Sequence, residues 1–432
     1  MALPRPLSGP LSAPGPRRLV IERLGARGDG IAQDEAGREA GFVTGALPGE
    51  VVEAAGDGEA PEPGAILTAS PERTAPICRF FGACGGCVIQ HASPALQAEW
   101  KRGLVAQALE RAGIAATINP LLDGHGEGRR RVTLHGRRRE AESLAGFMRA
   151  RSHELIAIDH CPILEARLAR APAIATALTG ALAASAKPLT ILVTATENGL
   201  DVDVRGNGPP SEKQRIGLTQ LASQLDLARL SIHGDTIVAR REPTQRMGRA
   251  LVTIPPGGFL QPTLAGEALL GRLAMEAVAG AKRVADLFAG SGPFALRLAE
   301  TAEVTAYESE EAALVALDKA ARATPGLRRV LTERRDLFRR PLLPLELKGF
   351  DAVVLDPPRA GSEAQCVQLA QSSVPRIAYI SCDVGSFARD AALLLKGGYQ
   401  LDSVTPVDQF RHSAHVELVG ILSKARPRAA RR

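Results

Sequence analysis

Aromatic side chains are scarce in this sequence, whose 432 residues include one Trp, three Tyr and eleven Phe. That scarcity argues against a binding surface built mainly from stacked rings. The chain also lacks any uninterrupted apolar run near the ~18 residues needed to cross a bilayer. Its first segment, MALPRPLSGPLSAPGPRR, has no apolar core of the kind found in signal peptides, and its prolines oppose an amphipathic targeting helix. We therefore expect a frayed tail over residues 1–17 and a cytoplasmic location.

Cysteine is sparse as well, because the whole chain carries six. So few cysteines in a chain of this length do not make a secreted disulfide scaffold. Three of them, Cys78, Cys84 and Cys87, nevertheless lie within ten positions in the stretch ICRFFGACGGCVIQ. Three thiols this close are compatible with a redox site, a disulfide or a metal site, and the spacing alone does not separate these possibilities.

Acidic residues are outnumbered by lysine and arginine, 47 against 53, which gives a formal net charge of +6 and a pI near 9.2. The excess of basic residues favours a polyanionic partner, although a solvated basic surface explains the charge equally well. The length corresponds to about three domains at ~150 residues each. A hydrophobic content of 45% is ample for sizeable cores.

The first part of the chain, residues 18–69, consists of short apolar runs separated by Gly, Asp and Pro: RLVIERL, DGIAQ, GFVTG, GEVVEAA and GAILTAS. This spacing predicts a small closed β-barrel of the oligonucleotide-binding type, with an irregular Gly-rich segment as the alternative. A helix is predicted within 91–119, and two arginine triplets, 129–131 and 137–139, flank the strand-like VTLHG. These arginines either hold phosphates or line a solvated edge strand.

From residue 283 the pattern changes to alternating apolar strands and helices: RVADLF, EVTAYE, RRVLTERRD, DAVVLDPP and RIAYISCD. Such runs are typical of an α/β fold with a parallel sheet buried on both faces, where ligands bind beyond the carboxyl ends of the strands. The residues expected at those ends are Asp286, Glu308, Asp336, Asp356 and Cys382. Five chemically useful side chains at one edge predict a site.

A Gly-rich turn, DLFAGSGPF, links the first of these strands to a helix, so its backbone can approach a ligand. The third glycine of a dinucleotide fingerprint is absent, because Ala295 occupies its place. Glu308 ends the next strand, where an acidic side chain commonly accepts hydrogen bonds from ribose hydroxyls. Together these features look like the S-adenosylmethionine site of a class I methyltransferase, with NAD as the minority alternative.

The fourth strand ends in VVLDPPRAG, which resembles the Asp-Pro-Pro motif of enzymes that methylate exocyclic amines of bases. Those enzymes follow the motif with an aromatic residue, whereas Arg359 stands here, so an amino-methyltransferase is the second choice. Cys382 indicates a different chemistry. A thiolate that adds to C6 of uracil makes C5 nucleophilic enough to take a methyl group. A base must then remove the C5 proton, and Glu417 in FRHSAHVELV is the candidate, with His412 and His415 nearby.

These motifs together resemble the S-adenosylmethionine-dependent RNA uracil-C5 (5-methyluridine) methyltransferases, over roughly residues 18–422. The resemblance implies an N-terminal TRAM barrel (1–70) that binds RNA, a central α+β domain (71–255) and a class I, Rossmann-like methyltransferase domain (256–432). The helix within 91–119 is expected to pack on that last domain. The resemblance also implies a substrate in 23S ribosomal RNA, with the T-loop uridine of tRNA second, and no obligate protein partner.

The residue roles implied by the resemblance are specific. Cys382 is the nucleophile and Glu417 the base, and the cofactor pocket is formed by Gln261, Phe288, Glu308, Asp336 and Asp356. Cys78, Cys84, Cys87 and Cys161 match the arrangement that holds a [4Fe–4S] cluster in one branch of the family. Four thiolates fit either zinc or an iron–sulfur cluster, and the resemblance favours the cluster over zinc. The chain departs from the family pattern at Thr263, Pro293 and Asp383, where the family often has Asn.

Overall fold

The computed structural model describes residues 17–34, 36–54, 63–139, 142–182 and 187–424. The expected tail therefore lies outside the described residues, except for Arg17. The chain forms two compact units. Unit 1 comprises residues 1–82, 87–100 and 412–414, and unit 2 comprises residues 83–86, 101–411 and 415–432.

Unit 1 contains a five-stranded antiparallel sheet in the order β3-β2-β1-β4-β5. Its strands are β1 (Arg17–Leu24), β2 (Gly30–Gln33), β3 (Glu39–Val43), β4 (Val51–Ala54) and β5 (Pro63–Thr68). In β1, Leu19 and Ile21 are buried while Val20 and Glu22 face solvent, which is the alternation of a strand with one covered face. The N-terminal region is thus rich in β-structure, as predicted. Among the described residues no pairing joins β3 to β5, so closure into a barrel stays a prediction.

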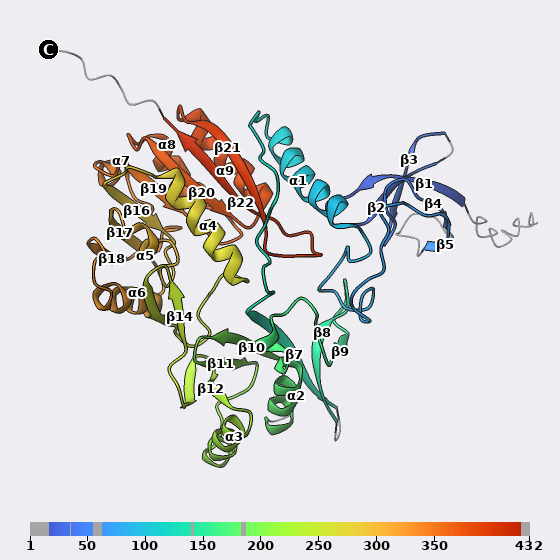
Figure 1. Cartoon of the computed structure of the whole chain (residues 1–432), viewed down its shortest axis with the longest axis horizontal. Helices are drawn as coiled ribbons and strands as arrows, with labels where there is room; N and C mark the ends of the chain where they lie inside the picture. The colour runs from blue at the N-terminus through green and yellow to red at the C-terminus, as the bar shows by residue number, and fades with distance from the viewer. Residues whose placement is uncertain (1–16, 35, 55–62, 140–141, 183–186, 425–432) are drawn as a thin grey trace, which may run out of the picture. The chain divides into compact units, whose positions relative to one another are not determined.

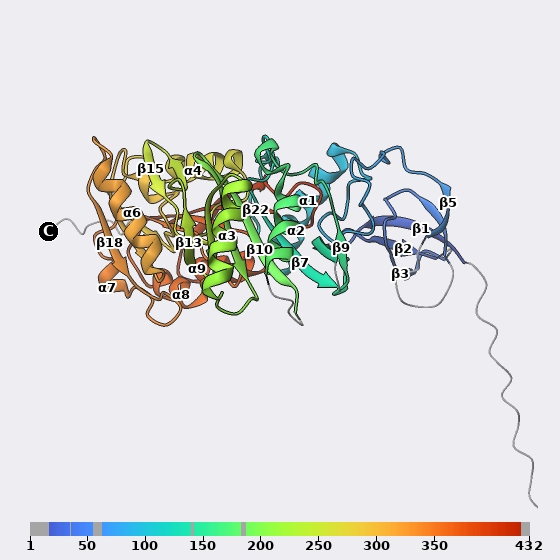
Figure 2. The ribbon, with the colours of Figure 1, turned by 90° about the horizontal axis from the view of Figure 1, so that it is seen from below.

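One sheet of unit 2 has seven strands in the order β13-β12-β11-β10-β7-β8-β9. They are β7 (Arg131–Arg139), β8 (Glu142–Met148), β9 (Leu155–Ala157), β10 (Leu189–Thr196), β11 (Gly199–Arg205), β12 (Leu227–Ile232) and β13 (Asp235–Ala239). Helices α2 (Ala171–Ala181) and α3 (Glu212–Gln224) pack side by side against it (Figure 2). A short 3-10 helix (Ala166–Leu168) and the hairpin of β14 (Thr244–Met247) and β15 (Ala250–Thr253) complete this part.

The second sheet of unit 2 has eight strands in the order β18-β17-β16-β19-β20-β22-β21-β6 (Figure 1). They are β6 (Leu122–Asp123), β16 (Arg283–Leu287), β17 (Glu303–Glu308), β18 (Val330–Arg334), β19 (Ala352–Leu355), β20 (Arg376–Ser381), β21 (Gln400–Asp408) and β22 (Glu417–Ser423). The five predicted strands, β16 to β20, are present and parallel. Only β22 runs against its neighbours, because it pairs antiparallel with both β20 and β21.

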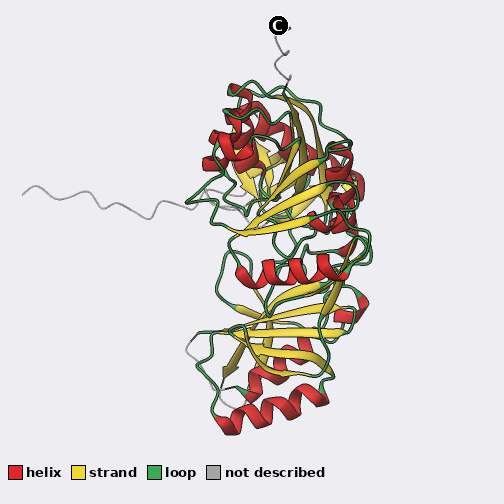
Figure 3. Ribbon diagram, turned by 90° about the vertical axis from the view of Figure 1, so that its left-hand side faces the viewer, coloured by secondary structure: helices red, strands yellow, loops and turns green. Residues whose placement is uncertain are grey.

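Helices flank this eight-stranded sheet on two sides (Figure 3). They are α4 (Leu264–Ala277), α5 (Ala295–Leu298), α6 (Glu311–Ala323), α7 (Pro344–Leu347), α8 (Glu363–Ala370) and α9 (Val384–Lys396). Fully buried side chains of β16, β17, β19 and β20 pack with those of α4, α5 and α6 in one apolar core. Burial on both faces explains why these strands are almost continuously apolar.

The directions of the strands determine which loops meet. Because β21 runs parallel to β20, its end at Asp408 lies at the same edge as the carboxyl ends of β16 to β20. The antiparallel β22 begins at that edge, with Glu417. Strand β6 also pairs in parallel with β21, and the helix α1 (Pro94–Arg111) precedes it.

From Lys101 onward α1 belongs to unit 2, where the Lys101 ammonium lies 2.6 Å from the Asp408 carboxylate. The proposed division at residues 70 and 255 stays a prediction. Within the described residues, no helix is both long and apolar enough to span a membrane.

Candidate active site

The turn after β16 forms one side of the site. Phe288 has a φ of +64°, a left-handed conformation that is unusual for a non-glycine residue, and Gly292 has a φ of +95°. The Gly290 N–H donates to the Glu308 carboxylate at 3.0 Å, so the Gly-rich turn and the end of β17 are joined directly. A Cβ atom added at Gly290 would meet no heavy atom within 4 Å, which leaves open space beside this turn.

Asp336 follows β18 and fixes the next loop. Its carboxylate accepts hydrogen bonds from the N–H groups of Phe338 (3.0 Å) and Arg339 (3.2 Å). The Phe338 ring then lies 5.3 Å from the Phe288 ring. Phe338 was not among the site residues expected from the sequence, although its position two residues after Asp336 was a usable signal.

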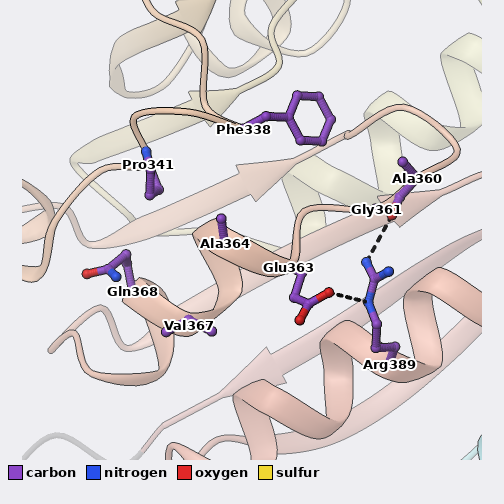
Figure 4. Close-up of a pocket in the computed structure, with 9 residues that line it drawn as sticks. All are labelled: Phe338, Pro341, Ala360, Gly361, Glu363, Ala364, Val367, Gln368 and Arg389. Atoms are coloured by element: carbon purple, nitrogen blue, oxygen red, sulfur yellow. Dashed lines mark hydrogen bonds and ion pairs between the residues drawn. The ribbon is translucent and has the colours of Figure 1, made fainter.

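A pocket of about 510 Å³ lies next to this loop and is lined by Phe338, Pro341, Ala360, Gly361, Glu363, Ala364, Val367, Gln368 and Arg389 (Figure 4). Arg389 donates to the Ala360 carbonyl at 2.9 Å and lies 3.6 Å from Glu363. None of the predicted site residues lines the pocket.

The loop before α4 carries Gln261, which is buried and donates from Nε2 to Asp356 Oδ2 at 3.3 Å. Arg130, which directly precedes β7 of the seven-stranded sheet, holds this loop: its Nε donates to the Gln261 carbonyl at 2.9 Å. The Arg130 guanidinium also lies 2.5 Å from the Glu267 carboxylate, and both side chains are fully buried. The predicted arginine triplet thus contributes a buried structural ion pair, which charge pattern alone did not reveal.

Cys382 lies between the end of β20 and the start of α9. Asp383 caps α9 by accepting from the N–H groups of Gly385 (3.0 Å) and Ser386 (2.9 Å). Arg359, which follows the Pro-Pro pair, lies 3.3 Å from the same carboxylate. Because Asn and Asp cap helices about equally well, what Asp adds at this position is the ion pair with Arg359.

The acid–base groups of the site influence one another. Burial raises the pKa of the Cys382 thiol to about 11, and the charges of Glu417 and Asp356 add to this. Burial also raises the pKa of Glu417 to about 7. The pKa of Asp356 is raised well above its usual value by burial and by the charges of Glu417 and Asp286. The structure therefore brings Cys382, Glu417 and Asp356 together, within electrostatic reach of one another.

Gln409 is a further residue that the sequence analysis missed. It follows β21, is fully buried, and donates from Nε2 to Gln261 Oε1 at 2.8 Å. The only sequence signal was its position at the end of a strand. The neighbouring Phe410 ring lies 5.6 Å from His415 and 5.2 Å from the Arg129 guanidinium carbon. His412 belongs to unit 1, where its Nδ1 lies 3.0 Å from Gln97 Oε1.

The four cysteines predicted to bind a metal, Cys78, Cys84, Cys87 and Cys161, are all half-buried. The Gly86 N–H donates to the Cys84 sulfur at 3.4 Å, an interaction that favours a thiolate. Within the described part of the chain, no group of three or more His, Cys, Asp or Glu side chains is arranged to hold a metal ion. The structure therefore does not support the predicted cluster.

Three comparisons with known proteins place this geometry in context. A family model described as tRNA (Uracil-5-)-methyltransferase matches residues 253–426. A Brucella suis protein described as an uncharacterized RNA methyltransferase is 44% identical over 409 residues, covering 95% of this chain and 98% of the relative. The 23S rRNA (uracil(1939)-C(5))-methyltransferase RlmD of Chromohalobacter salexigens is 36% identical over 439 residues, covering 95% and 90%.

Among solved structures, the Pyrococcus abyssi tRNA (uracil-54, C5)-methyltransferase in complex with S-adenosyl-L-homocysteine superimposes with a TM-score of 0.70. The match covers 94% of this chain and 100% of the other at 21% identity. At that identity the likeness establishes a shared mixed α/β fold and nothing more.

Proposed function

Because this chain belongs to the family of RNA (uracil-C5)-methyltransferases, we propose that it methylates C5 of one uridine in 23S ribosomal RNA through a covalent Cys382 adduct. The protein is an S-adenosylmethionine-dependent RNA uracil methyltransferase. The target and the adduct are the parts that we propose. The observation that carries the mechanism is the position of Cys382, Glu417 and Asp356 at one sheet edge, where the charges of Glu417 and Asp356 add to the raised pKa of the Cys382 thiol.

In the proposed reaction the Cys382 sulfur forms a bond to C6 of uracil, and its proton passes to solvent. The electrons of the C5–C6 double bond move toward O4, which leaves an enolate with carbanion character at C5. The electron pair at C5 then forms a bond to the methyl group of S-adenosylmethionine, while the bond from that methyl group to the sulfonium sulfur breaks and S-adenosylhomocysteine is left. Glu417 removes the C5 proton, the C5–C6 double bond is restored, and the thiolate leaves.

The pKa values of the site suit this order. A carboxyl with a pKa of about 7 is a far better base near neutral pH than an ordinary glutamate, yet it still ionises there. The thiol, with its pKa near 11, is mostly protonated near neutral pH. Because the Glu417 and Asp356 charges contribute to that value, protonation of either carboxyl favours the thiolate.

S-adenosylmethionine fits the residues present. We propose that Gln261, Phe288, Glu308, Asp336 and Asp356 hold it, beside the open space at Gly290. The class I, Rossmann-like assignment is supported by the strand order and by a single antiparallel strand, β22, next to the parallel set. It is also supported by the position of the Gly-rich turn at β16, where the strand order reverses.

The covalent mechanism is tested with two variants. Cys382→Ala should neither methylate RNA nor crosslink to it. Glu417→Gln keeps the shape of the side chain but removes its basicity, so a methylated protein–RNA adduct should accumulate and survive denaturing electrophoresis. RNA with 5-fluorouridine at the target should trap the wild-type enzyme, because fluorine does not leave as a proton does. An active Cys382→Ala variant, or adducts that do not depend on Cys382, would rule out the covalent mechanism. Direct methylation of an exocyclic amine would then be the leading alternative.

The choice of ribosomal RNA rests on the RlmD relative, whose similarity extends over almost the whole chain. Mapping 5-methyluridine in RNA from a deletion strain tests it. We expect loss of one modification in 23S ribosomal RNA. Loss confined to the T-loop of tRNA would overturn the proposed substrate and leave the chemistry in place.

We also propose that the N-terminal β-rich region is a TRAM domain that binds RNA, and that Cys78, Cys84, Cys87 and Cys161 bind a [4Fe–4S] cluster. This proposal rests on the resemblance, on four half-buried thiols and on the N–H donated to Cys84. The described residues themselves form no arranged metal site. No step of the reaction depends on it. Anaerobically purified protein should contain iron and acid-labile sulfide, and Cys161→Ser should lose both. A colourless preparation with one bound zinc would reject the cluster.

A further inference from the structure

The segment around β18 carries a high density of positive charge. Residues 328–340, RRVLTERRDLFRR, contain six arginines and two acidic residues, a net charge of +4 in a chain whose total is +6. Two of the arginines, at positions 328 and 329, precede β18. Arg339 and Arg340 follow it, in the loop of residues 336–342 (the β18 loop), and both are exposed. This second pair therefore lies at the carboxyl edge of the sheet, which is the edge of the candidate active site.

The backbone of the β18 loop is held from two sides. Arg335, whose side chain is 11% exposed, donates to the carbonyls of Arg340 at 2.7 Å and Pro341 at 3.0 Å. The buried Gln365 amide on α8 accepts from the Leu342 N–H at 2.8 Å and donates to the Leu342 carbonyl at 3.1 Å. The exposed side chains of the loop are thus presented from a fixed backbone, which lowers the entropy cost of binding a partner.

The exposed arginines of the β18 loop make few interactions within the protein. Arg339 is 87% exposed and lies 3.5 Å from the Asp336 carboxylate. Ion pairs this exposed contribute little to stability, so the guanidinium can exchange that partner for a stronger one. The Arg340 side chain forms no ion pair or hydrogen bond with any residue that the structure describes. Because arginine binds phosphate bidentately, two adjacent exposed arginines suit neighbouring phosphates of a nucleic acid.

The pocket of about 510 Å³ lies beside these arginines and is mostly apolar. Phe338 and Pro341 of the β18 loop line one side, and Ala364 and Val367 of α8 line the other (Figure 4). The volume is in the range of small-ligand sites, ~300–1,000 Å³. Phe338 is 48% exposed, so part of its ring is open to stacking by a base. An aromatic ring next to exposed arginines favours a single strand of nucleic acid over an acidic protein.

We propose that the β18 loop and this pocket bind a single-stranded stretch of the RNA substrate next to the target uridine. Arg339 and Arg340 bind phosphates, and one base enters the pocket against Phe338. This inference rests on the proposed function, which supplies the RNA and places the target uracil at Cys382. In the strand order the ends of β18 and β20 are four strand spacings apart, roughly 19 Å at ~4.8 Å each. A few nucleotides span that distance.

The first test measures the phosphate contacts in the double variant Arg339→Gln, Arg340→Gln. Full-length protein is titrated by fluorescence anisotropy into a 23S ribosomal RNA fragment that contains the mapped uridine, at salt concentrations from about 50 to about 200 mM. Each phosphate contact with a single strand adds about 0.7 to the slope of log affinity against log salt concentration, so the slope should become shallower by about 1.4. Affinity near 0.1 M salt should fall about tenfold.

The matched control is the double variant Arg328→Gln, Arg329→Gln. It removes the same charge from two exposed positions of the same segment, but at the opposite end of β18. Its salt slope should equal that of wild type. Equal slopes for the two double variants would overturn the inference.

The second test fills the pocket with Ala364→Phe, from an exposed position in the first turn of α8. RNA affinity should fall about tenfold with no change in salt slope, because no charge is altered. S-adenosylhomocysteine binding, measured by calorimetry, should stay within twofold of wild type in every variant. If Ala364→Phe weakens S-adenosylhomocysteine binding and leaves RNA binding intact, the pocket belongs to the cofactor and the inference is wrong. If wild-type protein neither binds nor methylates the fragment, the proposed substrate is wrong, and this inference with it.

Discussion

Replacing the buried base with its amide should make the protein more stable at alkaline pH, even though it abolishes turnover. Glu417 is 4% exposed, and burial raises its pKa from 4.5 to about 7 in the folded protein. In the unfolded chain the same carboxyl ionises near its ordinary value. Between those two pKa values the unfolded state binds fewer protons than the folded state, so wild-type stability falls as pH rises.

The size of this loss follows from the shift. A difference of about 2.5 pKa units corresponds to about 3 kcal/mol, fully lost above pH 7 and fully recovered below pH 4.5. Glutamine in the Glu417→Gln variant has no ionisable group and so carries no such penalty. The free energy of unfolding of the variant should therefore exceed that of wild type by up to about 3 kcal/mol at pH 8, and the advantage should disappear near pH 4.5.

The assay is urea or thermal unfolding of both proteins at closely spaced pH values from 4.5 to 8.5, taking the difference at each pH. Glu142→Gln, at an exposed position, is the control and should give a difference that does not change with pH. If the free energies of unfolding of Glu417→Gln and wild type differ by the same amount at every pH in this range, the carboxyl is not buried as described. The proposed role of Glu417 as a base with a raised pKa would then be wrong.

Three further outcomes are expected. Product release should increase as pH rises through about 7, because Glu417 must lose its proton to act; a release rate that is flat between pH 5.5 and 8.5 would contradict this. Gly292→Ala forces a Cβ atom into Leu317 at a φ of +95°, so calorimetry should show S-adenosylhomocysteine binding weakened at least tenfold, with Gly217→Ala on α3 as an unaffected control. Arg130→Met leaves Glu267 buried without one of its two arginines and should cost about 3–5 kcal/mol in urea unfolding, whereas the double change Arg130→Met, Glu267→Met should cost less.

The strands of the eight-stranded sheet could be predicted because buried parallel strands leave a local signature of apolar runs. The same signature predicted the edge at which Glu308, Asp336, Asp356 and Cys382 lie, since each lies at the end of a strand or within two residues after it. Gln409 could not be found in this way. Its importance depends on the direction of β21 relative to β20, which follows from a pairing with β22 and not from any local pattern.

Long-range pairing also explains what was missed around Gln261. Arg130 and Gln261 are separated by 131 positions, and an arginine triplet looks the same in sequence whether it faces water or a buried glutamate. The two-residue strand β6 has no periodicity to detect. The cysteines are a different case, because their assignment to a metal comes from the resemblance to a family and not from their spacing, and metal analysis of the purified protein tests it.

The pairing of β6 with β21 has a consequence for how the chain is made. Asp123 leaves the ribosome 285 residues before its partner Asp408, at a rate of about 5–20 residues per second. For many seconds the growing chain therefore contains β6 before its neighbouring strand, β21, has been synthesised. During the same time Lys101 lacks its ion-pair partner, Asp408. A fragment that begins at residue 256 would have the converse defect, with β21 left as an open edge available to other chains. Supplying residues 83–126 as a separate peptide should reduce aggregation of that fragment.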